Sequence, residues 1–409
     1  MLLWSRLRAE VAAYPRAFWV LWLGTLVNRL GLVVVPFLTL YLTTERGLRP
    51  SWAAALLSGY GLGAFLSSFA GGVLADRWGR RPVLLMGLMG GAALVALVPF
   101  VTALPALAVL VIALGFVTES YRPAVSAAIV DLVAEEQRTR AFALFYWVIN
   151  VGTAIAPVLG GALVLWSYDL LFALDAVTML VYGFVVAALI PETRPSRNAE
   201  AGADASGAEG PPTARALDAL RDPALLGLSA CTLLLAALMF QSLSVLPLVM
   251  ASQGLPETAY GFVAATNGLV IVLLSLPIAR FVEGRRPGAV LVSAALLFAA
   301  GFALHIPAAL LGGHAAATAV WTLGEIALVT VAPVMVARLS PDALRGAYQG
   351  VYGAAWGLAF LVAPLAGGVV FEELGRQALW MGCVGIGLVA ALGFASLAPQ
   401  MREPASGMA

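Results

Sequence analysis

The chain has 409 residues, of which 61% are hydrophobic and 11% charged, with a mean hydropathy of +0.94 and a formal net charge of +1. So little polar surface cannot cover a water-soluble particle of this size, which excludes a soluble globular protein. The balanced charge also gives no reason to expect nucleic acid as a partner. We therefore expect an integral membrane protein surrounded by the lipid bilayer.

Runs of apolar residues long enough to cross a bilayer recur along the whole chain. A membrane-spanning helix needs about 20 mostly apolar residues. Twelve runs of this kind are predicted to span the membrane, at residues 17–42, 51–75, 82–103, 105–131, 141–165, 168–190, 224–250, 257–281, 288–311, 314–337, 346–370 and 376–398. The first run is too long for the apolar region of a cleavable signal peptide, so we expect it to stay as the first helix. The expected fold class is all-α, an integral membrane protein with twelve transmembrane helices.

The distribution of basic residues predicts the orientation of these helices. Cytoplasmic loops carry the excess of Arg and Lys, and this chain contains Arg but no Lys. With the N-terminus inside, eighteen of the 23 arginines fall in cytoplasmic segments, three (Arg46, Arg49 and Arg376) fall in external segments, and two (Arg29 and Arg122) lie within predicted spans. We expect both termini in the cytoplasm. The Ala-rich composition with Arg in place of Lys points to a bacterial inner membrane.

A charged hairpin joins the second and third predicted helices. Residues 72–84 read Gly-Val-Leu-Ala-Asp-Arg-Trp-Gly-Arg-Arg-Pro-Val-Leu. This resembles Gly-x-Leu-x-Asp-Arg-x-Gly-Arg-Arg, the signature of the major facilitator superfamily of secondary transporters. The resemblance implies a cytoplasmic latch that favours the outward-open state, with the residues Gly72, Asp76, Arg77, Gly79, Arg80 and Arg81. Anchoring by positive charge alone would explain the arginines, but not Asp76 or Gly79.

The chain repeats itself at about half its length. Gly79-Arg80-Arg81-Pro82 recurs 205 positions later as Gly284-Arg285-Arg286-Pro287, with Phe281 in the place of Asp76. Ala156-Pro157-x-x-Gly160-Gly161 recurs 207 positions later as Ala363-Pro364-x-x-Gly367-Gly368. A duplicated six-helix unit is a known transporter design with a binding site near the midplane of the membrane. We predict six-helix bundles at 1–194 and 223–409, joined by a flexible cytoplasmic linker at 195–222.

Ionisable residues inside the predicted spans are expected to be paired or to line a cavity, because a charge at the bilayer centre is costly. They are Arg29 in the first span, Glu119 and Arg122 in the fourth, Asp175 in the sixth and Glu325 in the tenth. Glu119 and Arg122 are three residues apart and so share one helix face. They either neutralise each other or couple transport to protons, since an Arg governs when a neighbouring carboxylate releases its proton. The family resemblance favours coupling, because proton-exchanging members carry a functional Arg in this helix.

Three acids against two arginines leave one carboxylate without a basic partner, and such a carboxylate favours its protonated form. Glu325 is the first candidate to load and release a proton. It could instead attract a cationic substrate or make a structural hydrogen bond. Asp175 is nearer the outer end of its span, where packing explains it as well. Amides in hydrocarbon also need a partner, and Asn28, Gln241 and Asn267 complete the predicted substrate and proton pathway.

Two further patterns point to exchange of protons for substrate. The segment from Gly152 to Gly161, with Pro157 and Gly160, resembles the antiporter signature of helix five, although Ala156 replaces a Gly of that signature. Close helix packing explains the same small residues. Residues 28–41, beginning Asn28-Arg29-Leu-Gly31, look like the drug:proton antiporter branch of the family.

The sequence thus predicts a secondary active transporter that exports a small organic molecule in exchange for protons by alternating access. An uptake or export permease for a sugar, peptide or amino acid is the alternative within this class, and a non-transporting membrane sensor is a weaker one. An enzyme is not expected, because His305 and His314, the only two histidines, have no clustered acids or cysteines near them in sequence. We expect no cofactor and no metal, and a monomer.

Overall fold

The computed structural model describes residues 14–192, 219–341 and 344–399. The helices of the first half are α2 (Arg16–Gly31), α3 (Val34–Thr44), α4 (Pro50–Trp78), α5 (Arg80–Leu85), η1 (Met86–Gly90), α6 (Gly91–Leu97), η2 (Val98–Phe100), α7 (Leu104–Glu119), α8 (Tyr121–Leu132), α9 (Glu135–Val164) and α10 (Asp169–Leu189). Those of the second half are α13 (Pro223–Ser244), α14 (Leu246–Ser252), α15 (Glu257–Val282), α16 (Pro287–His305), α17 (Leu311–Leu339) and α18 (Arg345–Leu397).

These helices confirm the predicted fold class. Ten helical segments of the described chain are long and apolar enough to cross a membrane. One of these ten segments, within α18, consists of two helices that meet at Gly375, where φ is 79°, and so counts as two spans. The 29-residue helix α4 is a further span that the ten do not include. The helices of the described ranges therefore account for all twelve predicted spans. One span is shorter than predicted, because α16 ends at His305 and Pro307, two residues beyond it, cannot continue a helix.

Several spans are interrupted, which the apolar runs alone did not predict. The first span breaks between α2 and α3, the fourth at Ser120 between α7 and α8, and the seventh at Val245 between α13 and α14. In each case a proline follows, at Pro36, Pro123 and Pro247. Because proline has no N–H, the carbonyl four residues earlier loses its helical partner. The third span contains a π-helical turn, η1, a feature frequent at functional sites.

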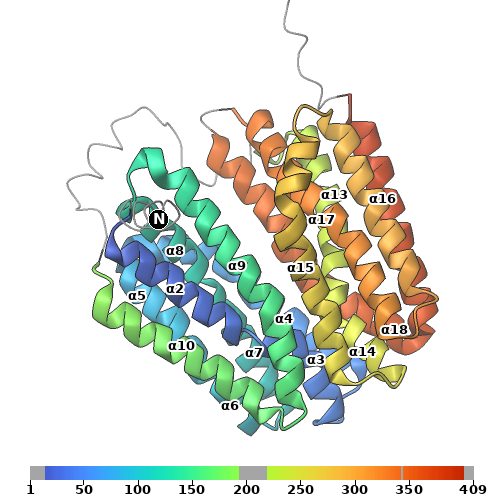
Figure 1. Ribbon diagram of the computed structural model, residues 1–409, viewed down its shortest axis with the longest axis horizontal. Coiled ribbons are helices and arrows are strands. Elements are labelled where there is room, and N and C mark those ends of the chain that lie inside the picture. The colour runs from blue at the N-terminus through green and yellow to red at the C-terminus, as the bar shows by residue number, and fades with distance from the viewer. Residues whose placement is uncertain (1–13, 193–218, 342–343, 400–409) are drawn as a thin grey trace, which may run out of the picture. The chain divides into compact units, whose positions relative to one another are not determined.

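The described residues form two compact units. The first contains the described chain up to Val34 and from Leu62 to 192. In it α2 packs against α9 and α10, and α5 packs against α8 and α10 (Figure 1). Its buried core is apolar and aromatic, with Phe18, Leu21 and Tyr182 each no more than 1% exposed.

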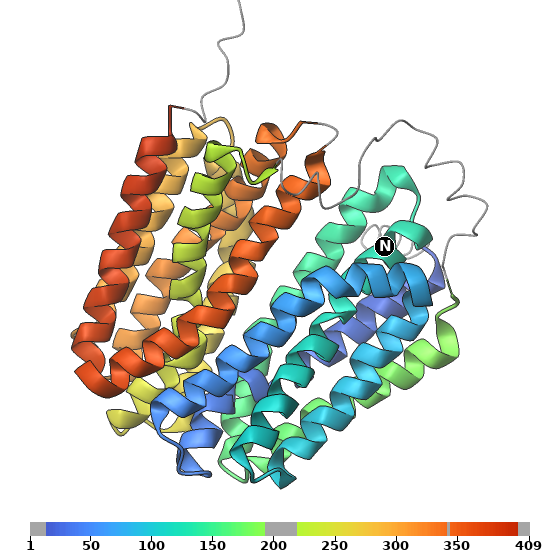
Figure 2. The same cartoon turned by 180° about the vertical axis from the view of Figure 1, so that it is seen from behind.

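The second unit contains Val35–Gly61 and the described chain from 219 onwards. In it α13 packs along α18, and α16 packs against α17 and α18. Figure 2 shows the two arms of α18 meeting at their bend. Near this bend, Glu372 accepts a hydrogen bond of 2.9 Å from the backbone N–H of Ser51 and forms an ion pair with Arg49. The stretch 35–61 thus packs with the later helices, and the predicted division at 1–194 and 223–409 stays a prediction.

Candidate functional site

A buried hydroxyl network lies in the first unit between α2, α8 and α10. The Tyr182 hydroxyl donates to the carbonyl of Leu21 at 3.0 Å, and Tyr121 donates to Tyr182 at 3.2 Å. Since the single hydroxyl proton of Tyr121 is used in this way, Thr25, 2.8 Å from Tyr121, is the donor in their contact. The network ties α2, α8 and α10 together in the interior of the first unit.

Arg29 lies next to this network and is only 9% exposed. It is close enough to Tyr121 and Tyr182 for its charge to act on their hydroxyl groups. Its backbone and Cβ pack against Gly152 of α9, so closely that a Cβ atom on Gly152 would overlap the Cβ of Arg29. Gly152 therefore sets the separation of α2 and α9 where Arg29 is buried.

We expect Gly152→Ala to impair transport, because the added methyl group must push Arg29 and α2 away from α9. Overpacking of this kind destabilises a fold by about 1–3 kcal/mol. Transport and thermal unfolding of the purified variant would be measured together. The matched control is Gly385→Ala in α18, where nothing lies within 4 Å of the added Cβ. Equal behaviour of the two variants would contradict a spacing role for Gly152.

Glu119 and Arg122 form the ion pair that their spacing predicted. Arg122 Nε lies 2.8 Å from Glu119 Oε2. Glu119 is the last residue of α7 and Arg122 the second of α8, so the pair bridges the break at Ser120. The carboxylate is 22% exposed and the guanidinium 60%. The pair is therefore accessible, and it lies at the junction of α7 and α8.

Asp175 contacts the backbone at the break between α2 and α3. It is 2% exposed and accepts a hydrogen bond from the backbone N–H of Val34, the first residue of α3. A helix N-terminus has N–H groups without intrahelical partners, and it attracts negative charge. The side chain of Asp175, from α10, thus caps α3. This contact gives Asp175 a structural role, while its predicted place in the substrate and proton pathway stays a prediction.

The cap predicts different effects for two substitutions of Asp175. Asp175→Asn keeps an acceptor oxygen and should retain transport and stability. Asp175→Leu removes the acceptor and should lower the free energy of unfolding by about 1 kcal/mol, the usual effect of losing a cap. Thermal unfolding in detergent measures the second effect and a transport assay the first. Loss of transport in the well-folded Asn variant would instead indicate that Asp175 titrates during the transport cycle.

The second unit brings Glu325 and Asn267 together. Asn267 Nδ2 donates to Glu325 Oε2 at 2.6 Å and to Thr322 Oγ1 at 3.0 Å, which uses both protons of the amide. Thr322 in turn donates to the carbonyl of Thr318 at 2.7 Å. Glu325 lies midway along α17 and is half-buried. Among the described residues no cation forms an ion pair with this carboxylate.

Gln241, the third predicted amide of the pathway, contacts another helix. Its Nε2 donates to the carbonyl of Ala363 at 2.7 Å, and its side chain packs against Gly367 so closely that a Cβ on that residue would overlap it. The motif of α18 that repeats the helix-five motif thus receives a side chain of α13, as Gly152 of α9 receives Arg29 of α2. Asn28, the remaining amide, is half-buried in α2.

The helix-five motif lies inside α9, with Pro157, Gly160 and Gly161 all buried. The continuous helix shows that Pro157 is accommodated without a break. The described contacts of Gly152 favour close packing as the reason for the first small residue of the motif. The antiporter interpretation of the motif stays a prediction.

The charged hairpin has acidic partners that the sequence analysis did not assign to it. Arg80 Nε lies 3.2 Å from Asp131 Oδ2 of α8. The backbone N–H groups of Arg80 and Arg81 donate to the two carboxylate oxygens of Glu192, at 2.9 and 3.2 Å. Gly79 has φ of 106°, a conformation that favours glycine.

The surroundings of Gly72 and the side chain of Asp76 are outside what the structure describes, and Arg77 is exposed. Of the predicted latch residues, Arg80 and Arg81 contact acids that were not part of the prediction, namely Asp131 and Glu192. The function of the hairpin as a latch stays a prediction.

Helices broken within their spans, with buried polar and charged side chains at the breaks, are the design of a secondary membrane transporter. Comparison with known sequences specifies the class further. The sequence profile of the Major Facilitator Superfamily matches residues 21–256 and 228–407. The chain belongs to this superfamily, and it is a multi-pass membrane transporter and not an enzyme.

Individual relatives agree with this assignment. The chain is 26% identical over 361 residues to the "Uncharacterized MFS-type transporter YqjV" of Bacillus subtilis (strain 168), with 87% of each chain covered. It is 26% identical over 362 residues to a "Na(+), Li(+), K(+)/H(+) antiporter" of Planococcus maritimus, covering 82% of this chain and 84% of the relative. Among solved structures, a POT family transporter in complex with 5-aminolevulinic acid matches with a TM-score of 0.79 at 16% identity, covering 95% of this chain and 97% of the other. At that identity the match shows the fold alone.

Proposed function

We propose that this transporter exports a small organic molecule in exchange for protons, with Glu325 as the proton carrier. The observation that carries the proposal is the Glu325 carboxylate in mid-helix, held by an amide and without an ion-pair partner among the described residues. A carboxylate surrounded by apolar residues is costly in its charged form. Its proton is therefore available for exchange against the positive charge or a hydrogen-bond donor of a substrate.

Asn267 orients this carboxylate. Because both of its amide protons are engaged, one by Glu325 and one by Thr322, Glu325 Oε2 is fixed as an acceptor. The second oxygen, Oε1, is then the atom that takes up or releases the proton. A substrate that competes for Oε1 would couple its own binding to proton release, which is the requirement for exchange.

The first unit would supply the second part of the mechanism. Glu119 and Arg122 bridge the break of the fourth span, and the tyrosine hydroxyls bond to Thr25 and Leu21 of α2, the helix that carries Arg29. We propose that these groups bind substrate or relay protons while the two predicted halves alternate between states open to either side. The antiporter of Planococcus maritimus among the relatives supports exchange, and the resemblance of residues 28–41 to drug:proton antiporters supports export.

The protein is further proposed to reside in a bacterial inner membrane with both termini in the cytoplasm and to act as a monomer. The excess of arginine in the predicted cytoplasmic segments supports this orientation. To test this orientation, both native cysteines are first replaced (Cys231→Ser/Cys383→Ser), and single cysteines are then introduced at exposed positions. Their reaction with a membrane-impermeant thiol reagent is measured in whole cells. Labelling of either terminus from outside would contradict the orientation.

The function is tested by internal pH in proteoliposomes that contain the purified protein. Lipophilic cations, neutral drugs, sugars and amino acids are added in turn, with protein-free liposomes as control. A proton flux that depends on one class of compound is the expected result and identifies that class. Flux with sugars or amino acids alone would favour the metabolite permease, and binding without any flux would favour a sensor.

A further inference from the structure

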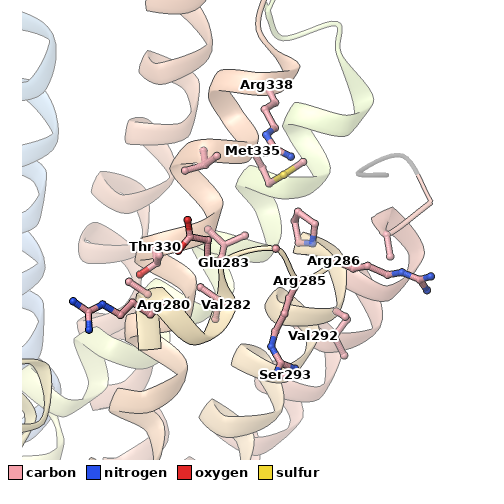
Figure 3. A pocket seen from close by; sticks show the side chains of 18 of the residues that line it. Arg280, Val282, Glu283, Arg285, Arg286, Val292, Ser293, Thr330, Met335 and Arg338 are labelled. Carbon is pink, nitrogen blue, oxygen red and sulfur yellow. The ribbon is translucent and has the colours of Figure 1, made fainter. Parts of the chain in front are cut away.

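The two ends of α16 and α17 in the second unit differ in their polar side chains. At the predicted cytoplasmic end, charged side chains that include Arg280, Glu283 and Arg286 line a pocket of about 1210 Å³ between α15, α16 and α17 (Figure 3). At the predicted outer end, His305 of α16 and His314 of α17 are buried and bond to each other. The outer ends of these helices are thus joined by a polar contact that the proposed function does not use.

Within the described residues, no acid balances a charge on this histidine pair, because neither ring bonds to a carboxylate. Apart from His305, α14 and α16 contain no ionisable residue. The charge that reaches the pair is positive, since Arg376 of α18 acts on His314. The acids predicted at the same outer end are Glu45 and Glu257, together with Glu372 and Glu373, which pair with Arg49. A buried charge without a partner is costly, so both rings are neutral in this structure.

A chain of three hydrogen bonds fixes which nitrogen of each ring carries a proton. Gln253 Nε2 donates to the carbonyl of Ala308 at 2.7 Å, so Oε1 of the same amide is an acceptor. His314 Nε2, which lies 2.8 Å from this Oε1, is therefore an N–H group. A neutral imidazole has one N–H, so His314 Nδ1 accepts the proton of His305 Nδ1, at 2.9 Å. The last atom of the chain, His305 Nε2, then carries a lone pair.

The pair has no suitable position for a further proton. His305 Nε2 is buried and has no hydrogen-bond partner among the described residues. Its ring is stacked on Trp380, with the ring centroids 5.0 Å apart, and an indole attracts a cation but has no acceptor atom for its N–H. A proton on His314 Nδ1 would instead face the N–H of His305 across 2.9 Å. Proton uptake and this arrangement of the rings therefore exclude each other.

The same chain of hydrogen bonds holds the end of α14. Gln253 directly follows this short helix, and its backbone N–H bonds to the carbonyl of Val249 at 3.2 Å. The other end of α14 lies at the break of the seventh span, at Val245. The Gln253 side chain joins α14 to His314 and to Ala308, in the segment between α16 and α17. Movement of His314 into water would break its bond with Gln253 and free this end of α14.

We propose that His305 and His314 form an acid-sensitive lock at the predicted outer end of the second unit. While both rings are neutral, the lock joins the end of α14, the last residue of α16 and the first turn of α17. Protons from the outer solution, one for each ring, give the pair like charges that separate it, and His314 then releases Gln253. Histidine changes its charge between about pH 5 and pH 8, so ordinary acidification opens the lock. The proposal does not depend on the transported substrate or on Glu325.

The reactivity of a cysteine at position 308 reports the opening of the lock in the purified full-length protein. Ala308→Cys is made in the Cys231→Ser/Cys383→Ser background. Ala308 is 5% exposed and contributes only its backbone carbonyl, so the substitution keeps the chain of hydrogen bonds. Leu310→Cys, at a 73% exposed position of the same segment, is the matched control for the effect of pH on thiol chemistry.

The ratio of the two reaction rates, Ala308→Cys over Leu310→Cys, should rise as the pH is lowered from about 8 to about 5. The open state binds protons that the closed state does not, so the ratio can rise by up to about tenfold per pH unit for each proton taken up. A ratio that stays constant over this range would overturn the proposal.

A histidine variant separates this lock from other acid-sensitive groups. His305→Asn/His314→Gln, combined with each reporter cysteine, removes both titratable rings and keeps an amide N–H near each ring N–H that donates. Its rate ratio should not change with pH. If the ratio rises with acid in this variant as it does with both histidines present, other groups open the segment and the proposal is wrong.

A second measurement needs no substitution. The chain contains only two histidines, so nitrogen NMR of the full-length protein with isotope-labelled histidine reports this pair alone, with a purification tag that contains no histidine. At about pH 8, one ring should carry its proton on Nδ1 and the other on Nε2, and on acidification both rings should become doubly protonated together. The same N–H position in both rings, or independent titration of the two, would contradict the lock even if the histidine variant did not fold.

Discussion

Replacing Glu325 with Gln should abolish proton-coupled transport and leave the protein folded. Gln has nearly the shape of Glu and can still accept the hydrogen bond from Asn267, which is 2.6 Å long in the wild type. It cannot take up or release a proton at the second oxygen. Substrate-driven proton flux in proteoliposomes should therefore fall by at least about 100-fold, the usual scale for removing a positioned acid or base.

Measuring substrate binding by the Glu325→Gln variant shows whether transport is lost because the proton carrier is missing or because the protein is unfolded. If Glu325 carries the proton, the Gln variant mimics the protonated state and should still bind substrate, or exchange it across the membrane without net proton movement. If Glu325 instead attracts a cationic substrate, binding is lost together with transport. If its hydrogen bond is only structural, both activities persist and the proposal fails.

The matched control is Glu283→Gln, an exposed carboxylate of the same unit. It removes one negative charge without touching the amide network, so it should leave proton coupling unchanged. Asn267→Leu provides the complementary variant. It frees Glu325 from its only described hydrogen bond, and we expect transport to persist with an altered dependence on pH.

The fold was predictable because the bilayer imposes a simple rule on sequence. Each span must be about 20 apolar residues long, and the predicted spans follow from that rule. The breaks within spans were predictable too, in part, since Pro36, Pro123 and Pro247 each remove a backbone donor within a span. Prolines alone are an incomplete signal, because α9, α15 and α17 continue through Pro157, Pro277 and Pro333.

Pairings between near neighbours in the sequence were also predictable, and pairings between distant segments were not. Glu119 and Arg122 are neighbours in sequence, and the ion pair between them is present. The partners of Arg80 are 51 and 112 positions away, at Asp131 and Glu192, and no local pattern specifies them. Only the arrangement of the helices in space brings such residues together.

The tyrosine network was missed for a related reason. Tyr121 and Tyr182 resemble ordinary packing aromatics in the sequence, because one end of a tyrosine is apolar. Their buried hydroxyl groups can be recognised as a network only from the structure, which places Thr25 and the carbonyl of Leu21 within hydrogen-bonding distance. The position of Tyr121 between Glu119 and Arg122 was the one local signal that could have indicated it.

The second large effect on transport is expected from the ion pair between Glu119 and Arg122. We expect both Glu119→Gln and the double variant Glu119→Gln/Arg122→Gln to lose pH-driven transport. The single variant should also be less stable, by about 1 kcal/mol for a pair as exposed as this one, because Arg122 keeps its charge without its carboxylate partner. The double variant removes both charges and should regain that stability.

The comparison of the two variants decides between the interpretations that the sequence left open. If the pair only neutralises itself, the double variant restores transport along with stability, because nothing charged remains to be compensated. If the pair couples protons, stability returns and transport does not. Proton flux and thermal unfolding measured on the same preparations provide both readouts. Recovery of pH-driven transport in the double variant would remove Glu119 and Arg122 from the mechanism and leave Glu325 as the proton carrier.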